Sequence, residues 1–173
     1  MTPNPSHTQI VQSWLTACAP HTPVSRALEA IYQHVHTETI ARQPLCQASG
    51  RCCNFEKHGH RLYVTGIEAA YMFARLEGDN RARATLEQVN AARTRGDCPY
   101  LINNLCAAHT IKPLGCRVYY CDPTAQRWQE ELSEYALAQI RAIHDEHMLE
   151  YRYGEWRSML EQVIEAAGAS QDR

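Results

Sequence analysis

The stretch Pro44–Gly59 reads PLCQASGRCCNFEKHG, and a second stretch, Gly96–Gln126, reads GDCPYLINNLCAAHTIKPLGCRVYYCDPTAQ. Pro, Gly, Asn and Ser interrupt any helical or strand period in both, so we expect two irregular loops, the first loop and the second loop. Seven of the eight cysteines of the chain lie in these loops. Reduced thiols gathered in this way are typical of a metal site, and we expect the fold to form around it.

Helical signals precede the first loop. Residues 1–45 contain a short helical segment, SHTQIVQSWLTAC, and then a second helix that opens with Thr22 and Pro23. Threonine is a favoured helix cap and proline is favoured in the first helical position. We therefore expect two N-terminal helices.

Between the loops, the sequence predicts a strand and two helices. HRLYVT, residues 60–65, is a candidate short strand. Thr65 and Glu68 form a capping-box pair, which predicts a helix from Thr65 to about Gly78. Residues 79–95 predict a further helix with an exposed, charged surface.

The region after the second loop returns to a helical pattern over residues 127–168. Apolar and aromatic residues recur there at steps of three and four, which predicts helices with one buried face. These residues are Trp128, Leu132, Tyr135, Leu149, Tyr153, Trp156, Leu160 and Val163.

Together these patterns predict a mainly α fold in one small domain, residues 1–173. N-terminal helices over 1–45 and C-terminal helices over 127–168 bracket a cysteine-cluster core over 46–121, whose irregular loops bind metal and leave room for one short hairpin. A chain of 173 residues can bury a core without cross-links.

The composition of the chain bears on its cellular location and on the classes of partner that it can bind. Lys and Arg total 17 against 19 Asp and Glu, a balance that predicts no nucleic-acid partner and no membrane-surface partner. No run approaches the roughly 20 apolar residues of a membrane span, and the N-terminal sequence lacks the order of a signal peptide. We expect a cytoplasmic protein with reduced thiols and with exposed helices available to a protein partner.

The number of thiols bears on the kind of metal site. Four thiolates close one zinc site, and two tetrahedra that share a bridging thiolate need seven, whereas a [4Fe–4S] cluster uses four. The number of thiols favours zinc as the cofactor. Iron, or a [4Fe–4S] cluster, is the alternative. The adjacent pair of cysteines is expected to diverge and to serve different ions. The seven candidate ligands are Cys46, Cys52, Cys53, Cys98, Cys106, Cys116 and Cys121.

Other side chains near these cysteines are candidates for supporting roles. Arg51, Lys112 and Arg117 could offset the negative charge of the thiolates, and the alternative is that they are simply solvated. His109 is a candidate nitrogen ligand, with a surface histidine as the alternative. Cys18 lies apart in the first helix and is expected to be a packed or free thiol.

The order of these motifs resembles the YkgJ-like cysteine-cluster family, whose members are described as zinc- or iron-chelating domains and whose pattern also occurs in flagellin lysine methylases. The matching text is CQASGRCC at 46–53, Thr65 with Glu68, CPYL at 98–101 and CAAHTIKPLGCR at 106–117. The resemblance spans residues 46–121. It implies metal chelation by these cysteines, and an iron–sulfur role has been proposed for the methylases, but it does not imply an activity.

The chain departs from the family pattern at three positions. Ser49 stands where the family has its second cysteine, His109 replaces a tyrosine and Lys112 replaces an arginine. A hydroxyl is a poor ligand beside thiolates, so the ligand set of the first loop is one smaller than in the family. His109 could compensate for that loss.

Three functions follow from these observations as hypotheses. The first is a metal-binding structural or binding module. The second is a redox or methyl-transfer enzyme, or an enzyme subunit, built on a [4Fe–4S] cluster. The third is metal trafficking or sensing. The chain has no Gly-rich phosphate loop, no G-x-S-x-G elbow and no H-E-x-x-H motif, so whether it is an enzyme stays open.

Overall fold

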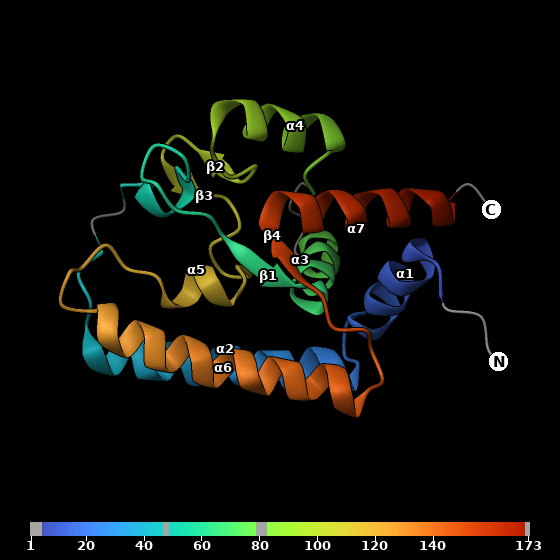
Figure 1. The fold of residues 1–173 in the computed structure, drawn as a ribbon, viewed down its shortest axis with the longest axis horizontal. Helices are drawn as coiled ribbons and strands as arrows, with labels where there is room; N and C mark the ends of the chain where they lie inside the picture. Colours follow the sequence, from blue (N-terminus) through green and yellow to red (C-terminus); the bar gives the residue numbers. More distant parts are fainter. Residues whose placement is uncertain (1–4, 47–48, 79–82, 172–173) are drawn as a thin grey trace.

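The computed structural model describes residues 5–46, 49–78 and 83–171 (Figure 1). Seven α-helices, one short 3-10 helix and two two-stranded sheets form the regular structure of these residues, which confirms the mainly α fold. The helices are α1 (His7–Ala17), α2 (Pro23–Arg42), η1 (Arg51–Cys53), α3 (Gly66–Gly78), α4 (Leu86–Arg95), α5 (Leu114–Val118), α6 (Gln126–Glu146) and α7 (Trp156–Gln171). The strands are β1 (Tyr63–Thr65), β2 (Leu101–Ile102), β3 (Leu105–Cys106) and β4 (Tyr153–Glu155).

Two groups of helices share one hydrophobic core. Helices α1, α3 and α7 pack on one another, while α2 and α6 lie side by side with α5 against them (Figure 1). Trp14 of α1 is fully buried, and a Cβ on Gly66 would fall 2.5 Å from its ring. The contact between α1 and the start of α3 therefore requires glycine at position 66.

The helices α2 and α3 begin where their capping residues predict. The hydroxyl of Thr22 accepts a hydrogen bond from Ser25 N–H, and Pro23 is the first helical residue. Thr65 N–H donates to the carboxylate of Glu68 over 2.9 Å. Such caps satisfy N–H groups that have no partner within the helix.

The C-terminal region departs from the prediction of helix throughout. Helix α6 ends at Glu146, so Leu149 and Tyr153 lie outside any helix. Tyr153 belongs to β4 and pairs with Thr65 of β1, about 90 residues earlier in the chain. Tyr135 is also 53% exposed and does not join the buried face of α6. Pairing with a distant strand overrides the local helical spacing.

The helix predicted over residues 79–95 is shorter than expected. Helix α4 begins at Leu86, where Thr85 and Gln88 form a reciprocal capping box. Residues 79–82 of that prediction lie outside the described residues.

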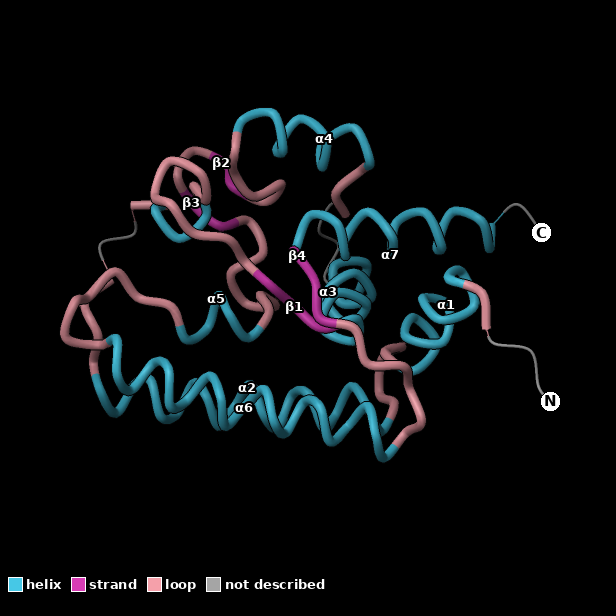
Figure 2. The backbone as a smooth tube through the Cα atoms, viewed as in Figure 1, coloured by secondary structure: helices cyan, strands magenta, loops and turns pink. Residues whose placement is uncertain are grey.

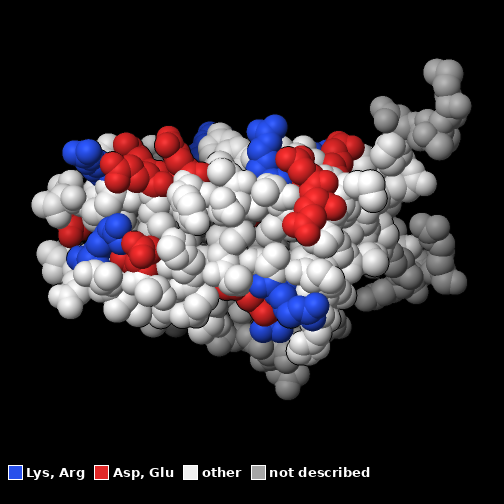
Figure 3. Space-filling model, turned by 90° about the horizontal axis from the view of Figure 1, so that it is seen from below, with Lys and Arg blue, Asp and Glu red and all other residues white. Residues whose placement is uncertain are grey.

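The surface of α2 and α6 carries charges of both signs. Figure 3 shows Lys and Arg interspersed with Asp and Glu on this face, with wide neutral areas between them. No helix among the described residues is long and apolar enough to span a membrane.

The two cysteine loops lie side by side at one end of the molecule. Figure 2 shows the loop that carries η1 next to the hairpin of β2 and β3, at the end away from α1. The strands β1 and β4 and helix α3 connect this end to the helical core.

Candidate metal centre

The first loop turns at Gly50 and then forms η1. Gly50 has a φ of +69°, and a Cβ there would lie 2.8 Å from the carbonyl oxygen of Asn104 in the second loop. Both the left-handed backbone and the close approach require glycine. The carbonyl of Gly50 accepts hydrogen bonds from Cys53 and Asn54 N–H over 3.0 and 3.1 Å. This turn positions the paired cysteines.

A tight hairpin forms the facing part of the second loop. β2 and β3 pair across Asn103 and Asn104, whose φ values are +51° and +62°. Two central residues with positive φ are typical of the type I′ turn, which matches the twist of the strands. The hairpin places Cys106, in β3, opposite Leu101, three residues after Cys98.

Backbone hydrogen bonds join the two loops. Cys98 N–H donates to the carbonyl of Cys53 over 2.9 Å, and Glu56 N–H donates to the carbonyl of Gly96 over 3.0 Å. These two bonds therefore fix the position of the paired cysteines relative to the hairpin.

Four thiols meet where the loops join. The Sγ atoms of Cys52 and Cys53 lie 3.9 Å apart, and Cys98 and Cys106 are close enough to the Cys53 thiol to act on its pKa. We call these four residues the thiol cluster. The expectation that the adjacent pair diverges is wrong, because its two sulfurs are in contact.

Contacts within the thiol cluster shift the pKa values of its members in opposite directions. Hydrogen bonding with Cys53 lowers the pKa of Cys52 to about 6 and that of Cys106 to about 7, and the charge of Lys112 acts in the same direction. Hydrogen bonding with Cys106, then Cys52 and Cys98, raises the pKa of Cys53. Near neutral pH, thiolate character is therefore concentrated on two cysteines that flank a protonated thiol.

The side chains are grouped around Cys53 rather than around a common point. No set of three or more His, Cys, Asp or Glu side chains in the described residues is arranged to hold a metal ion as it stands. Metal ligands must also be deprotonated, whereas hydrogen-bonded thiols retain protons. Metal binding therefore requires proton loss and rotation of these side chains.

The donor set nevertheless suits zinc or iron. Two thiolates on one tetrahedral ion, each about 2.3 Å from it, lie about 3.8 Å apart. The distance between the Cys52 and Cys53 sulfurs is 3.9 Å. Only small movements of this pair are needed to bring both onto one ion.

The other three loop cysteines border the thiol cluster. Cys46 and Cys121 line a cavity of about 60 Å³ together with Cys52. Cys116, whose pKa is raised by burial, shares another cavity with Cys52. Ser49 also lines the first of these cavities. Cys52 thus adjoins every group of loop cysteines, and residues 47–48 lie outside the described residues.

Glu68 connects the start of α3 to the second loop. Its buried carboxylate accepts hydrogen bonds from Thr65 N–H over 2.9 Å and from Leu114 N–H over 2.8 Å. Leu114 begins α5, the helix that carries Cys116. The sequence indicated the cap at Thr65 but gave no sign that the same carboxylate holds α5.

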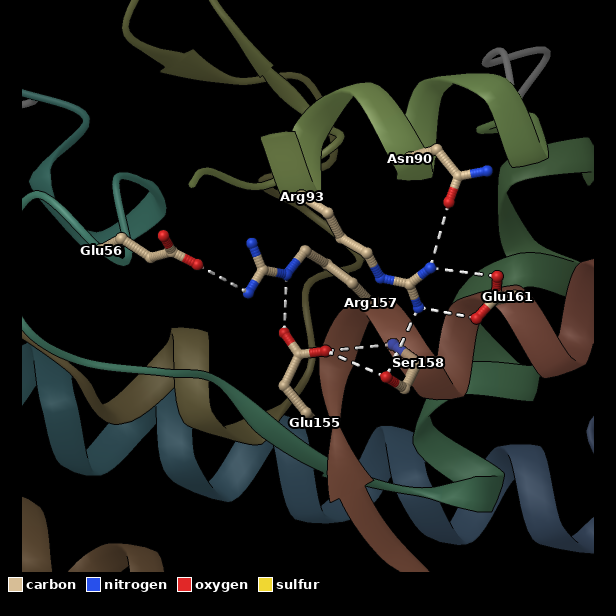
Figure 4. A network of polar contacts seen from close by, with 7 residues as sticks. All are labelled: Glu56, Asn90, Arg93, Glu155, Arg157, Ser158 and Glu161. Carbon is tan, nitrogen blue, oxygen red and sulfur yellow. Dashed lines mark hydrogen bonds and ion pairs between the residues drawn. The ribbon is translucent and has the colours of Figure 1, made fainter. Parts of the chain in front are cut away.

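A polar network ties the first loop to α7 (Figure 4). Arg157 is 4% exposed; its guanidinium donates to Glu155 over 2.8 Å and is paired with Glu56 over 3.6 Å. It also lies over the ring of Phe55. Arg93 joins the same network through a 2.7 Å ion pair with Glu161, so α4 is anchored to α7 as well.

The three basic candidates have different surroundings. Arg51 is exposed and lines the cavity of Cys46 and Cys121. Lys112 acts electrostatically on Cys52, Cys106 and Cys116. Arg117 turns the other way, stacks on Tyr32 at 4.1 Å and donates to the carbonyl of Thr110.

Neither His109 nor Cys18 belongs to the thiol cluster. His109 lies 3.2 Å from Lys112 Nζ and lines a different cavity, whose described walls contain no cysteine. Cys18 is fully buried and its thiol donates to the carbonyl of Ile67 over 3.3 Å, as expected of a packed thiol.

His60 also lies beside the thiol cluster, although the sequence did not single it out as a ligand. Its Nε2 lies 3.2 Å from the carbonyl of Cys52, and its ring stacks on Tyr119 with centroids 5.1 Å apart. Proximity to the paired cysteines in sequence was the only available signal.

Comparisons of the chain with protein-family models, with curated proteins and with solved structures find no match. The resemblance to the YkgJ-like family therefore remains a prediction based on the motif alone.

Proposed function

We propose that this protein binds zinc or iron through the thiolates of the thiol cluster, and that the bound ion holds the two loops together as a structural and binding module. The observation that carries the proposal is the meeting of four thiols from two loops at Cys53. Four thiolates are the ligand number of a closed tetrahedral site. The bound ion would supply cross-linking energy that these irregular loops otherwise lack.

The sulfur geometry favours a single ion over an iron–sulfur cube in this position. Each cysteine of a [4Fe–4S] cluster binds a different iron, which keeps the cysteine sulfurs further apart than on one ion. The contact between the Cys52 and Cys53 sulfurs, at 3.9 Å, supports two ligands on one ion.

The proposal extends to a second ion that shares Cys52. Cys52 belongs to the thiol cluster and also lines a cavity with Cys46 and Cys121. Its sulfur is therefore the natural bridging ligand of a two-ion site with seven thiolates, completed by Cys116.

Metal transfer is the second candidate function. Cys46, Cys52 and Cys121 are exposed, and none of the eight cysteines forms a disulfide. Exposed thiolates can exchange metal with an incoming ligand. Both candidates place the protein in a reducing compartment, for which we propose the cytoplasm, with a protein partner that uses the exposed helices.

Metal content decides the main proposal. Protein purified with and without air is analysed for zinc and iron and by visible absorption, and we expect about two ions per chain, of which the ion at Cys53 is retained against a mild chelator. Cys53→Ser should lose most of this metal. Cys18→Ser is the matched control, because Cys18 is a buried cysteine remote from the cluster, and it should retain metal.

The double variant Cys46→Ser/Cys121→Ser addresses the second ion. It should remove one of two ions and leave the site at Cys53 loaded. A wild-type protein without stoichiometric metal, or a Cys53→Ser variant that retains its metal, contradicts the proposal. Intense iron–sulfur absorption would instead support the alternative of a [4Fe–4S] cluster.

A further inference from the structure

A cavity of about 460 Å³ opens between α2, α3 and the second loop. Tyr32 and Tyr71 line it from the helices, and His109, Lys112 and Arg117 line it from the second loop and α5. Its volume falls within the range of about 300–1,000 Å³ that is usual for small-molecule pockets. We call it the polar cavity, and no cysteine lies on its described walls.

Among the described residues, Lys112 and Arg117 of the polar cavity have no ion-pair partner. No described carboxylate lies within ion-pairing distance of Lys112 or Arg117. Glu68 and Cys116 act on Arg117 only electrostatically, without a direct contact. A cation that is partly removed from water without an anion is unfavourable, so the cavity favours an anion from outside.

The guanidinium of Arg117 is also incompletely hydrogen-bonded. Within the described residues its one hydrogen bond runs to the carbonyl of Thr110 over 3.1 Å, and its buried Nε has no partner. Stacking on Tyr32 at 4.1 Å holds the group in place. A guanidinium fixed in this way has donors left for a carboxylate or phosphate.

The remaining walls add donors rather than competing anions. Lys112 Nζ lies 3.2 Å from His109 Nε2, which leaves further ammonium protons free. His36 lies on the α2 side of the cavity. Glu29, the one acidic residue among the described residues of the lining, already accepts from Tyr71 over 3.2 Å and pairs with Arg75 over 3.4 Å.

We propose that the polar cavity binds a small organic molecule through an oxyanion, a carboxylate or a phosphate, held by Arg117 and Lys112. The tyrosine rings provide apolar contacts for the rest of the molecule. The described walls of this site contain none of the cysteines, although Lys112 also acts electrostatically on Cys52, Cys106 and Cys116.

Calorimetric titration with succinate and with inorganic phosphate tests the inference, and succinamide serves as the uncharged control. We expect saturable binding of at least one anion and no binding of succinamide. The anion that binds more tightly shows whether the natural ligand carries a carboxylate or a phosphate. Arg117→Gln and Lys112→Gln should each weaken binding about 10- to 100-fold, the loss expected for a charge-assisted hydrogen bond.

Arg127→Gln is the matched control, since Arg127 is 92% exposed on α6, away from the cavity. It should bind like the wild type. If Arg117→Gln fails to fold, Lys112→Gln decides the matter. Absence of saturable binding by both anions, retained affinity in the folded variants, or equal weakening in Arg127→Gln overturns the inference. Metal content measured in each sample separates this result from the metal proposal.

Discussion

Glu68 holds together two segments that lie 46 residues apart. Its carboxylate accepts from Thr65 and from Leu114, while burial raises its pKa against the opposing effect of these hydrogen bonds. A single side chain thereby fixes both the cap of α3 and the first residue of α5.

Glu68→Gln should lower the free energy of unfolding by about 1–3 kcal/mol, because an amide has one acceptor oxygen and its NH₂ group would face a buried donor. Urea denaturation measures the change. Glu131→Gln, at an exposed ion pair on α6, is the control and should change stability by less than about 1 kcal/mol. Equal effects of the two substitutions would show that Glu68 has no special role.

His144 predicts how stability depends on pH. Its ring is fully buried, Nδ1 lies 3.3 Å from the carbonyl of Leu149, and burial lowers its pKa below the ordinary value of 6.5. Hydrogen bonding with Leu149 and Glu150, and the charge of Asp145, oppose this shift. The folded protein therefore keeps this imidazole neutral where the unfolded chain binds a proton.

Stability should consequently fall as the pH is lowered through 6.5, by at most about 1.4 kcal/mol per pH unit from this residue. His144→Asn retains a donor for Leu149 and removes the titration. Its unfolding free energy, measured between pH 7.5 and 5.5, should fall less steeply than that of the wild type. Parallel curves for the two proteins would rule out His144 as the source.

At the scale of elements, the fit of the first loop against the hairpin depends on Gly50. Gly50→Ala should destabilise the protein and weaken metal retention, because the new Cβ meets Asn104 O at 2.8 Å. Gly59→Ala is a matched control, since Gly59 has nearly the same φ, +68°, but nothing within 4 Å of an added Cβ.

Thermal unfolding and metal analysis of both variants compare these effects. Gly59→Ala should show only the conformational cost of a left-handed residue, about 1–2 kcal/mol, and keep its metal. If the two variants behave alike, the contact between the loops does not matter for the centre.

The elements predicted from the sequence are those with local signals. Thr22 with Pro23 and Thr65 with Glu68 marked two helix starts, because caps act within one turn. The break before α7 was missed, since β4 forms only through pairing with β1. For the site, cysteine number indicated the candidate ligands, but the Asn103–Asn104 turn that folds the hairpin was not recognised as a hairpin signal.

At the scale of the whole molecule, the thiol cluster and the helical core should differ in their dependence on metal. Hydrogen exchange with and without a chelator tests this. Chelation should increase exchange at Cys98 and Glu56 N–H, which join the loops, before it affects α7, which packs in the core. Unchanged protection at these two amides would contradict a metal-dependent junction.

Because β1 pairs with β4, a newly made chain cannot complete its fold until the residues of β4 have been added. Protein synthesis adds about 5–20 residues per second, so Tyr153 follows Thr65 by several seconds. Before that interval ends all seven loop cysteines have been made, while β4 and α7, which anchor their loops, have not. The nascent chain thus presents its thiols before its scaffold, when oxidants and metal ions compete for them most directly.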